Sequence, residues 1–85
     1  IEVRNISELN EVLHTGGVDR ILLDNFSFPD LTEAVRIIDK KYITEASGGI
    51  TEENVADYAA CGVDYISMGA ITHSVKSLDM SLKAF

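Results

Sequence analysis

The chain has no tryptophan, one proline and one cysteine among its 85 residues. Because Cys61 is alone, a disulfide within the chain and a multi-cysteine metal site are excluded, which favours a reducing compartment such as the cytoplasm. No apolar run is long enough to span a membrane. Basic residues are also scarce: seven Lys and Arg against 14 Asp and Glu give a net charge of −7. This balance argues against nucleic acid or an anionic membrane surface as a partner.

Short apolar runs recur along the chain with a spacing of 22 residues. Glu2, Asp24, Ala46 and Met68 stand 22 positions apart, each at or near the end of such a run. Between the runs, apolar residues follow the i, i+3, i+4, i+7 spacing of an amphipathic helix. The alternation predicts parallel strands over residues 1–3, 20–23, 42–46 and 65–68, with a helix after each of the first three. Polar and apolar residues alternate over 78–83, which predicts a final strand that leaves the parallel sheet.

These elements indicate an α/β fold, specifically the C-terminal portion of an incomplete (β/α) barrel. Four strands cannot close a barrel, and a complete (β/α)₈ barrel needs about 250 residues. We therefore expect residues 1–85 to be a partial barrel from a longer chain, with its earlier barrel strands and any N-terminal domain absent. Residues 17–23 also resemble residues 62–68. This repeat fits either a half-barrel duplication or the shared demands of helix-to-strand turns.

Local signals mark where the three helices begin and end. Asn5 and Glu8 have the spacing of a capping box, and Pro29 suits a first helical turn. Thr51 is the expected N-cap of the third helix, and Gly62 is expected to end it. On this prediction, the helix begins directly after the glycine turn at residues 48–49.

Two glycine turns follow the third and fourth expected strands, at Ser47-Gly48-Gly49 and at Gly69-Ala70. Glycine lets the backbone approach a ligand closely, and a helix N-terminus adds partial positive charge. Loops after the last two strands of (β/α) barrels form phosphate sites in this way. The pair of turns therefore predicts a phosphorylated ligand, held mainly by backbone N–H groups because few basic residues lie near. An ordinary strand-to-helix turn is the alternative.

Acidic side chains at the expected strand ends are the second candidate site. Glu2 and Asp24 would be neighbouring carboxylates at one mouth, able to bind a divalent cation or ribose hydroxyls, or to stabilise a developing cation. The alternative is that Asp24-Asn25 is only a polar turn and Glu2 a solvated strand residue. His73, in the turn expected after Gly69, is a candidate to hydrogen-bond the same phosphate, and a helix-terminus or packing residue is the alternative. Lys76 is the one basic residue expected near a glycine turn, and it is interpreted as a solvated residue.

Five segments resemble the C-terminal part of quinolinate phosphoribosyltransferase, also called nicotinate-nucleotide pyrophosphorylase (carboxylating). The resemblance covers essentially all 85 residues, in order. It is carried by Leu22-Leu23-Asp24-Asn25, Glu45-Ala46-Ser47-Gly48-Gly49-Ile50-Thr51, Gly62 to Ala70, Thr72-His73-Ser74 and Leu78 to Leu82.

The resemblance implies a fold, a reaction and a set of site residues. The family joins an N-terminal α/β sandwich to an incomplete barrel and assembles as a homodimer or larger homo-oligomer. It converts quinolinate and 5-phosphoribosyl-1-pyrophosphate to nicotinate mononucleotide, pyrophosphate and CO₂ in NAD biosynthesis, with Mg²⁺. Glu2 and Asp24 match the carboxylates that face the ribose and metal. The 5-phosphate-binding positions match Ser47, Gly48, Gly49, Gly69 and His73. Glu45 matches a position without a specified role, and the residues that grip quinolinate lie upstream.

Two other functions remain open. One is a paralogue of the same family that is associated with molybdenum transport. The other is a non-catalytic half-barrel that binds a phosphorylated ligand or a partner subunit. We expect this segment alone to be inactive, because it lacks the upstream quinolinate-binding residues.

Overall fold

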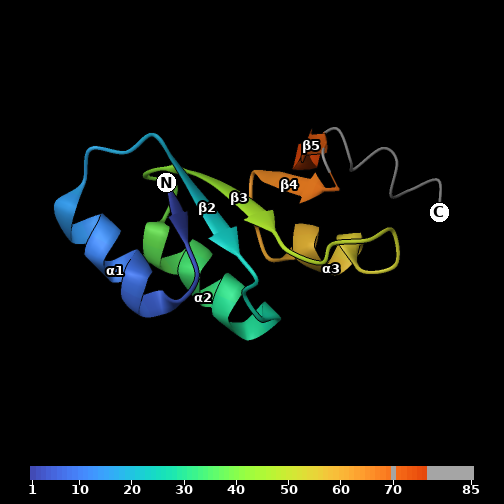
Figure 1. Cartoon of the computed structure of the whole chain (residues 1–85), viewed down its shortest axis with the longest axis horizontal. Helices are drawn as coiled ribbons and strands as arrows, with labels where there is room; N and C mark the ends of the chain where they lie inside the picture. Colours follow the sequence, from blue (N-terminus) through green and yellow to red (C-terminus); the bar gives the residue numbers. More distant parts are fainter. Residues whose placement is uncertain (70, 77–85) are drawn as a thin grey trace.

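Five strands form one sheet in the order β1–β2–β3–β4–β5 in the computed structural model, which describes residues 1–69 and 71–76 (Figure 1). Strands β1 to β4 are mutually parallel, which confirms the four parallel strands expected from the sequence. The fifth strand runs antiparallel to β4. The bounds are Glu2–Val3 (β1), Arg20–Asp24 (β2), Ile43–Ser47 (β3), Tyr65–Met68 (β4) and Ile71–Ser74 (β5).

Strand β5 was not predicted from the sequence. The sequence predicts His73 in a turn, but residues 71–74 pair with β4 and carry the chain back toward the amino ends of the parallel strands. The pairing of the two strands runs from Met68 and Ile71 to Tyr65 and Ser74. The strand predicted over residues 78–83 lies outside the described residues.

Three helices connect the parallel strands: α1 (Ile6–Thr15), α2 (Phe28–Ile38) and α3 (Val55–Ala60). The predicted start of α1 is confirmed, because the Glu8 N–H donates to Asn5 Oδ1 at 2.9 Å. Helix α2 begins after Ser27 with Pro29 in its first turn, also as predicted. No helix of the described residues has the length and apolar character needed to cross a bilayer.

The prediction for the start of the third helix was wrong. Thr51 does not cap α3, which begins four residues later, at Val55, and is six residues long. The Thr51 N–H is instead donated to Asn54 Oδ1 at 2.8 Å, while Asn54 Nδ2 donates to the Gly49 carbonyl at 3.1 Å. Asn54 therefore closes a turn between β3 and α3, and this separates the glycine pair from the helix.

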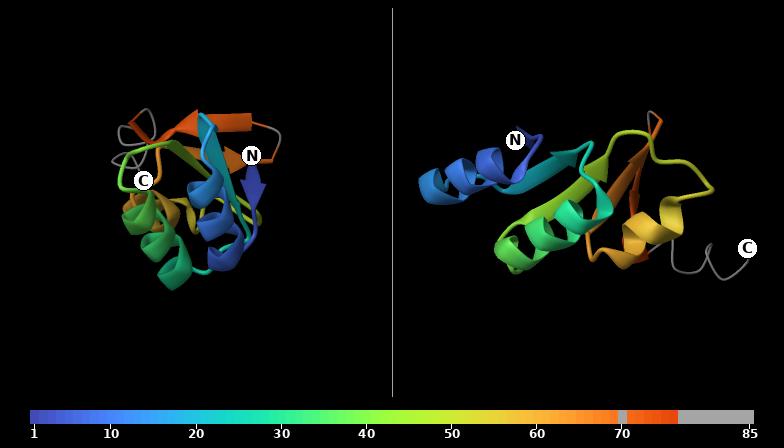
Figure 2. Two further views of the ribbon diagram at one scale, coloured as in Figure 1. Left: turned by 90° about the vertical axis from the view of Figure 1, so that its left-hand side faces the viewer. Right: turned by 90° about the horizontal axis from the view of Figure 1, so that it is seen from below.

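All three helices cover the same face of the sheet, and the opposite face is open (Figures 1 and 2). On the covered face, strand side chains pack against apolar helix residues and exclude water. From the strands these are Val3, Ile21, Leu23, Ala46 and Ile66, and from the helices Leu9, Leu31, Ala34, Ile38 and Val55. Because side chains alternate along a strand, Arg20, Asp24, Glu45, Ser47 and Ser67 project from the open face.

Candidate functional site

The carboxyl ends of β2 and β3 meet at one edge of the sheet, where they bring Asp24 and Ser47 together. The register pairs these two residues directly, and Ser47 Oγ donates to Asp24 Oδ1 at 3.0 Å. Both side chains are half-buried. Two residues that the sequence assigned to different roles, ribose and phosphate recognition, are therefore in contact at one site.

Glu2 lies on the same open face but not at the same level. The register pairs Glu2 with Leu22, so it stands two residues short of Asp24 along the strand direction. At about 3.3 Å per residue, this offset is roughly 7 Å along the strands. The two carboxylates thus face the same space without touching, and Glu2 is exposed. The 22-residue spacing identified the strand ends correctly but did not fix their relative height.

The expected Mg²⁺ ligands Glu2 and Asp24 would supply two carboxylates. Within residues 1–69 and 71–76, no group of three or more His, Cys, Asp or Glu side chains is placed to hold a metal ion. Mg²⁺ in substrate sites commonly takes one or two carboxylates and completes its shell with phosphate oxygens and water. The donor set therefore fits an ion that enters with a phosphorylated substrate.

The two glycines of the first turn have different surroundings. A Cβ on Gly48, whose φ is +97°, would lie 2.3 Å from Asn25 Oδ1 and 2.9 Å from the Asn25 backbone nitrogen. Asn25 is fixed there because its N–H donates to the Ser47 carbonyl at 3.0 Å. Gly48 is thus required by the neighbouring strand end. Gly49 has a φ of +67° and an ideal Cβ would meet no atom within 4 Å, so the side facing solvent is open.

Backbone donors are available at this turn. The N–H groups of Gly48, Gly49 and Ile50 donate to no acceptor among the described residues. Such N–H groups at a strand end are suited to bind anionic oxygens. The helix contribution expected from the sequence is weaker than predicted, because α3 begins at Val55. Gly69, with a φ of +64° and open space beside it, offers a second turn after β4.

His73 is in β5 and not in the turn after Gly69. The register places it opposite Ile66, which is fully buried on the helix-covered face. Directly opposed residues of an antiparallel pair project to the same face. His73, half-buried, therefore projects to the side of the sheet opposite to Thr72. Its assigned contact with phosphate stays a prediction.

A hydrogen-bonded group that the sequence did not reveal lies on the open face, one level below the mouth. Glu45 is buried, with only 8% of its surface exposed. Its Oε1 accepts from Arg20 Nη1 at 3.0 Å, and its Oε2 accepts from Ser67 Oγ at 2.6 Å. The Arg20 guanidinium also lies 4.5 Å from the centre of the Tyr65 ring. The alternation of Arg20, Leu22 and Asp24 in β2 was the available signal, since it puts Arg20 on the same face as Asp24.

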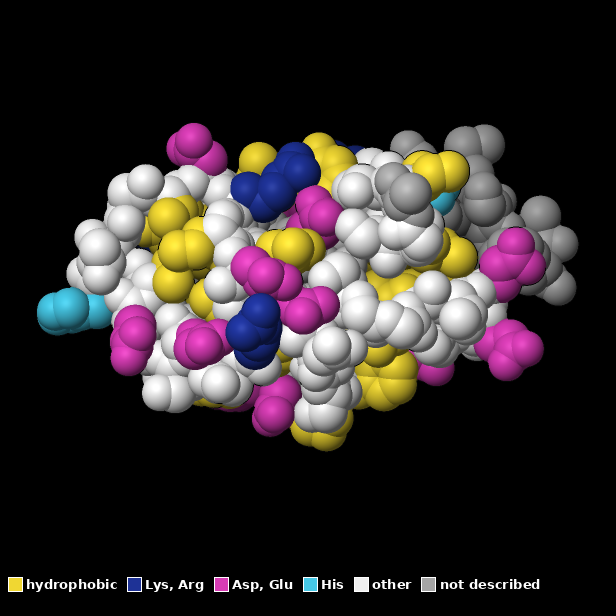
Figure 3. All heavy atoms as spheres, viewed as in Figure 1, with side chains coloured by type: hydrophobic (Ala, Val, Ile, Leu, Met, Phe, Trp, Pro, Cys, Tyr) yellow, Lys and Arg dark blue, Asp and Glu magenta, His cyan; other side chains and the backbone are white. Residues whose placement is uncertain are grey.

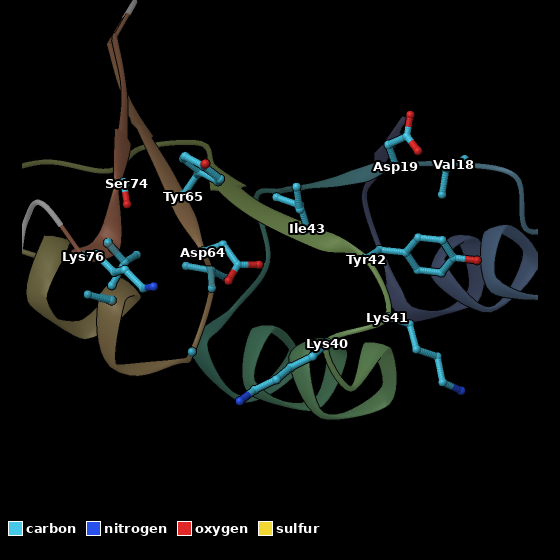
Figure 4. A pocket seen from close by; sticks show the side chains of 14 residues that line it. Val18, Asp19, Lys40, Lys41, Tyr42, Ile43, Asp64, Tyr65, Ser74 and Lys76 are labelled. Carbon is cyan, nitrogen blue, oxygen red and sulfur yellow. The ribbon is translucent and has the colours of Figure 1, made fainter.

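The expectation that Lys76 lies near a glycine turn was wrong. Strand β5 returns the chain to the amino edge, where the Val75 N–H donates to the Asp64 carbonyl at 2.9 Å. Lys76 lines a hollow of about 740 Å³ there, together with Lys40, Lys41 and Tyr42 (Figure 4). Ligands of parallel α/β folds bind at the opposite, carboxyl edge, so we do not place the functional site in this hollow.

Acidic residues outnumber basic ones two to one in this chain. Figure 3 shows acidic side chains spread over the visible face with few basic ones among them, in keeping with the net charge of −7. Few basic side chains are therefore available to an anionic ligand at the mouth, where the glycine turn supplies backbone N–H groups.

Parallel βα units with one helix-covered face, and polar groups at the carboxyl edge, define the class of this chain as a segment of a (β/α) barrel domain. A family model described as "Quinolinate phosphoribosyl transferase, C-terminal domain" matches residues 1–83. The chain belongs to this family.

Similar proteins carry consistent names. A probable nicotinate-nucleotide pyrophosphorylase [carboxylating] of Methanocaldococcus jannaschii is 52% identical over 89 residues, which cover 96% of this chain and 31% of that protein. A mitochondrial quinolinate phosphoribosyltransferase [decarboxylating] 2a of Nicotiana tabacum is 44% identical over 97 residues, which cover 98% of this chain and 28% of that protein. The chain thus spans less than a third of the length of these relatives.

Solved structures agree with the fold. The nicotinate-nucleotide pyrophosphorylase of Ehrlichia chaffeensis superposes with a TM-score of 0.76 and 46% identity, over 81% of this chain and 25% of that chain. The enzyme of the same name from Francisella tularensis gives a TM-score of 0.75 and 43% identity, over 86% and 26% of the respective chains. The α/β fold class and the family resemblance deduced from the sequence are therefore confirmed.

Proposed function

We propose that this chain is the catalytic barrel segment of a quinolinate phosphoribosyltransferase. The complete protein would convert quinolinate and 5-phosphoribosyl-1-pyrophosphate to nicotinate mononucleotide, pyrophosphate and CO₂. The observation that carries the proposal is the contact between Asp24 and Ser47 at the mouth, beside the open N–H groups of the Gly48–Gly49 turn. The names of the relatives support the same activity.

The site separates phosphate binding from charge stabilisation. Backbone N–H groups of the Gly48–Gly49 turn and of Gly69 would bind the 5-phosphate, with Ser47 and His73 beside them. This anchors the ribose so that its C1 faces the open side of the sheet. The Ser47 hydroxyl, which now donates to Asp24, would turn toward the phosphate when ligand binds.

Asp24 and Glu2 would act on the ribose ring. In the reaction, the quinolinate nitrogen forms a bond to C1 while the bond from C1 to the pyrophosphate oxygen breaks. While the bond to pyrophosphate breaks, positive charge develops on the ribose ring, and a nearby carboxylate would stabilise it. The 2-carboxylate of the pyridine ring leaves as CO₂, and a proton takes its place on the ring carbon. Mg²⁺, when bound with the substrate, would neutralise charge on the departing pyrophosphate.

Several parts of the proposal concern the complete protein. They are a homodimeric or larger assembly, a cytoplasmic location, and quinolinate-binding residues supplied by the upstream segment. The excess of acidic residues in the present segment supports the last point, because a dianionic substrate needs positive charge at the site.

Asp24→Ala in the full-length protein tests the proposed role. We expect quinolinate-dependent pyrophosphate release to fall by about 10²–10³ in kcat, the usual cost of removing one group that stabilises developing charge. Asp19→Ala is the matched control, because it removes a carboxylate that precedes the same strand at the amino edge. An unchanged rate in Asp24→Ala would exclude the assignment. A wild-type protein without quinolinate turnover would exclude the activity and favour the transport-associated paralogue.

A further inference from the structure

In addition to their backbone pairing, strands β2 to β5 are connected across the open face by a chain of side-chain contacts. Arg20 of β2 and Ser67 of β4 both donate to the Glu45 carboxylate of β3, and Ser67 Oγ lies 3.2 Å from Thr72 Oγ1 of β5. We call Arg20, Glu45, Ser67 and Thr72 the cross-strand belt. The reaction steps proposed above make no use of it.

The direction of every hydrogen bond in the cross-strand belt is determined. An ionised carboxylate only accepts, so Ser67 must donate its single hydroxyl proton to Glu45. Ser67 then has only lone pairs to offer Thr72, and the Thr72 hydroxyl must be the donor between them. The Ser67 proton is consequently directed at Glu45 and the Thr72 proton at Ser67, so neither is available to a phosphate oxygen.

Its location also separates the belt from phosphate binding. Glu45 is negatively charged and lies two residues before Ser47 in β3, below the turn, so direct contact with a phosphate would be repulsive. Arg20 partly neutralises Glu45, and the contact with the Tyr65 ring further restrains its guanidinium. The belt is therefore suited to hold its neighbours in place and unsuited to bind the ligand.

What the belt holds in place is the relative position of the two glycine turns. Backbone pairing between β3 and β4 joins Glu45 with Tyr65 and Ala46 with Ile66. The Glu45–Ser67 hydrogen bond extends this connection one residue beyond Ile66, toward Gly69. Thr72 adds β5, which carries His73. The belt thus links the Ser47–Gly48–Gly49 turn to the elements that carry Gly69 and His73.

We propose that Glu45 is a positioning residue, which acts through Ser67 to set the spacing of the two turns that bind the 5-phosphate. This inference rests on the proposed function for the identity of the phosphorylated substrate. It predicts that loss of the cross-strand belt weakens binding of 5-phosphoribosyl-1-pyrophosphate but not of quinolinate, because quinolinate would be bound by residues outside this segment.

Glu45→Gln is the informative change, since it keeps the shape of the side chain. If its amide oxygen faces Ser67, its NH₂ group faces Arg20 and two donors oppose each other. If the amide is reversed, Ser67 must reverse its own donation. Ser67→Ala leaves the Arg20–Glu45 pair intact and therefore tests the same link with less risk to folding. Glu33→Gln is the matched control, because Glu33 also pairs with an arginine, Arg36, but on the exposed side of α2.

Two measurements on the full-length protein decide the matter: calorimetric binding of 5-phosphoribosyl-1-pyrophosphate without quinolinate, and the KM of each substrate. We expect Glu45→Gln and Ser67→Ala each to weaken 5-phosphoribosyl-1-pyrophosphate binding about tenfold, with quinolinate KM changed less than about twofold. Because the two residues act as one unit, the double variant should bind no more weakly than either single variant. Glu33→Gln should behave as wild type.

The opposite results are equally clear. Wild-type affinity in both variants, equal changes for both substrates, or additive losses in the double variant would overturn the positioning role. If the wild type binds 5-phosphoribosyl-1-pyrophosphate but does not turn over quinolinate, the proposed function fails, while the binding comparison still decides the role of Glu45. If the wild type does not bind the sugar phosphate, both are overturned.

Discussion

The two faces of the sheet come from the same strands but differ in chemistry. In β2, Ile21 and Leu23 project to the helix-covered face and are fully buried. At the two ends of the same strand, Arg20 and Asp24 project to the open face and make polar contacts with β3. One face therefore stabilises the fold by excluding water, whereas the other holds charged groups at fixed distances. Substitutions of adjacent residues in one strand should therefore have different effects: on the covered face they should lower stability, and on the open face they should lower activity.

Leu23→Ala should give the largest effect, on stability. Leu23 is 1% exposed in the centre of the covered face, and truncating such a residue costs about 2–5 kcal/mol. Urea unfolding of the full-length variant measures the loss. Asp24→Ala, one residue later, should cost far less stability while it removes activity. Equal destabilisation by both substitutions would contradict the division between the two faces.

Gly48→Ala and Gly49→Ala sharpen the comparison at the mouth. At Gly48 a methyl group would collide with the backbone of Asn25, so the strand ends must move apart at a cost of about 1–3 kcal/mol. At Gly49 only the unfavourable positive φ opposes the substitution, which costs about 1 kcal/mol. Unfolding experiments on the two full-length variants rank them. A larger loss at Gly49 would show that the packing of Gly48 on Asn25 is not the dominant constraint.

The smallest effect is expected at the exposed pair of Glu33 and Arg36. The hydrogen bond from Arg36, with their charge attraction, lowers the pKa of Glu33 and raises that of Arg36. Such a pair stabilises the fold at pH values above the ordinary carboxyl pKa. The contribution disappears as the pH falls through the lowered pKa of Glu33. Arg36→Gln should therefore return the Glu33 pKa to its ordinary range in an NMR titration, without a measurable change in unfolding at neutral pH. A Glu33 pKa that stays as low in Arg36→Gln as in the wild type would contradict this account.

The sequence predicted the parallel strands, the helix faces and the family, because apolar periodicity and glycine turns are local signals. Strand β5 was missed, since its four residues carry no alternation that distinguishes a strand from a turn. The sequence wrongly predicted Thr51 as the N-cap of α3, because nothing local in the sequence shows that the Asn54 side chain accepts the Thr51 N–H. That hydrogen bond forms only in the folded loop. The Arg20–Glu45 pair escaped notice because it joins residues 25 positions apart, and only the register of β2 and β3 brings them together.

The position of a bound phosphate tests the central claim most directly. A crystal structure of the full-length protein with nicotinate mononucleotide would reveal it. The account predicts the 5-phosphate within hydrogen-bonding distance of the N–H groups of the Gly48–Gly49 turn and of Gly69, with Asp24 facing the ribose. A phosphate bound at the amino edge, beside Lys40 and Lys76, would contradict it.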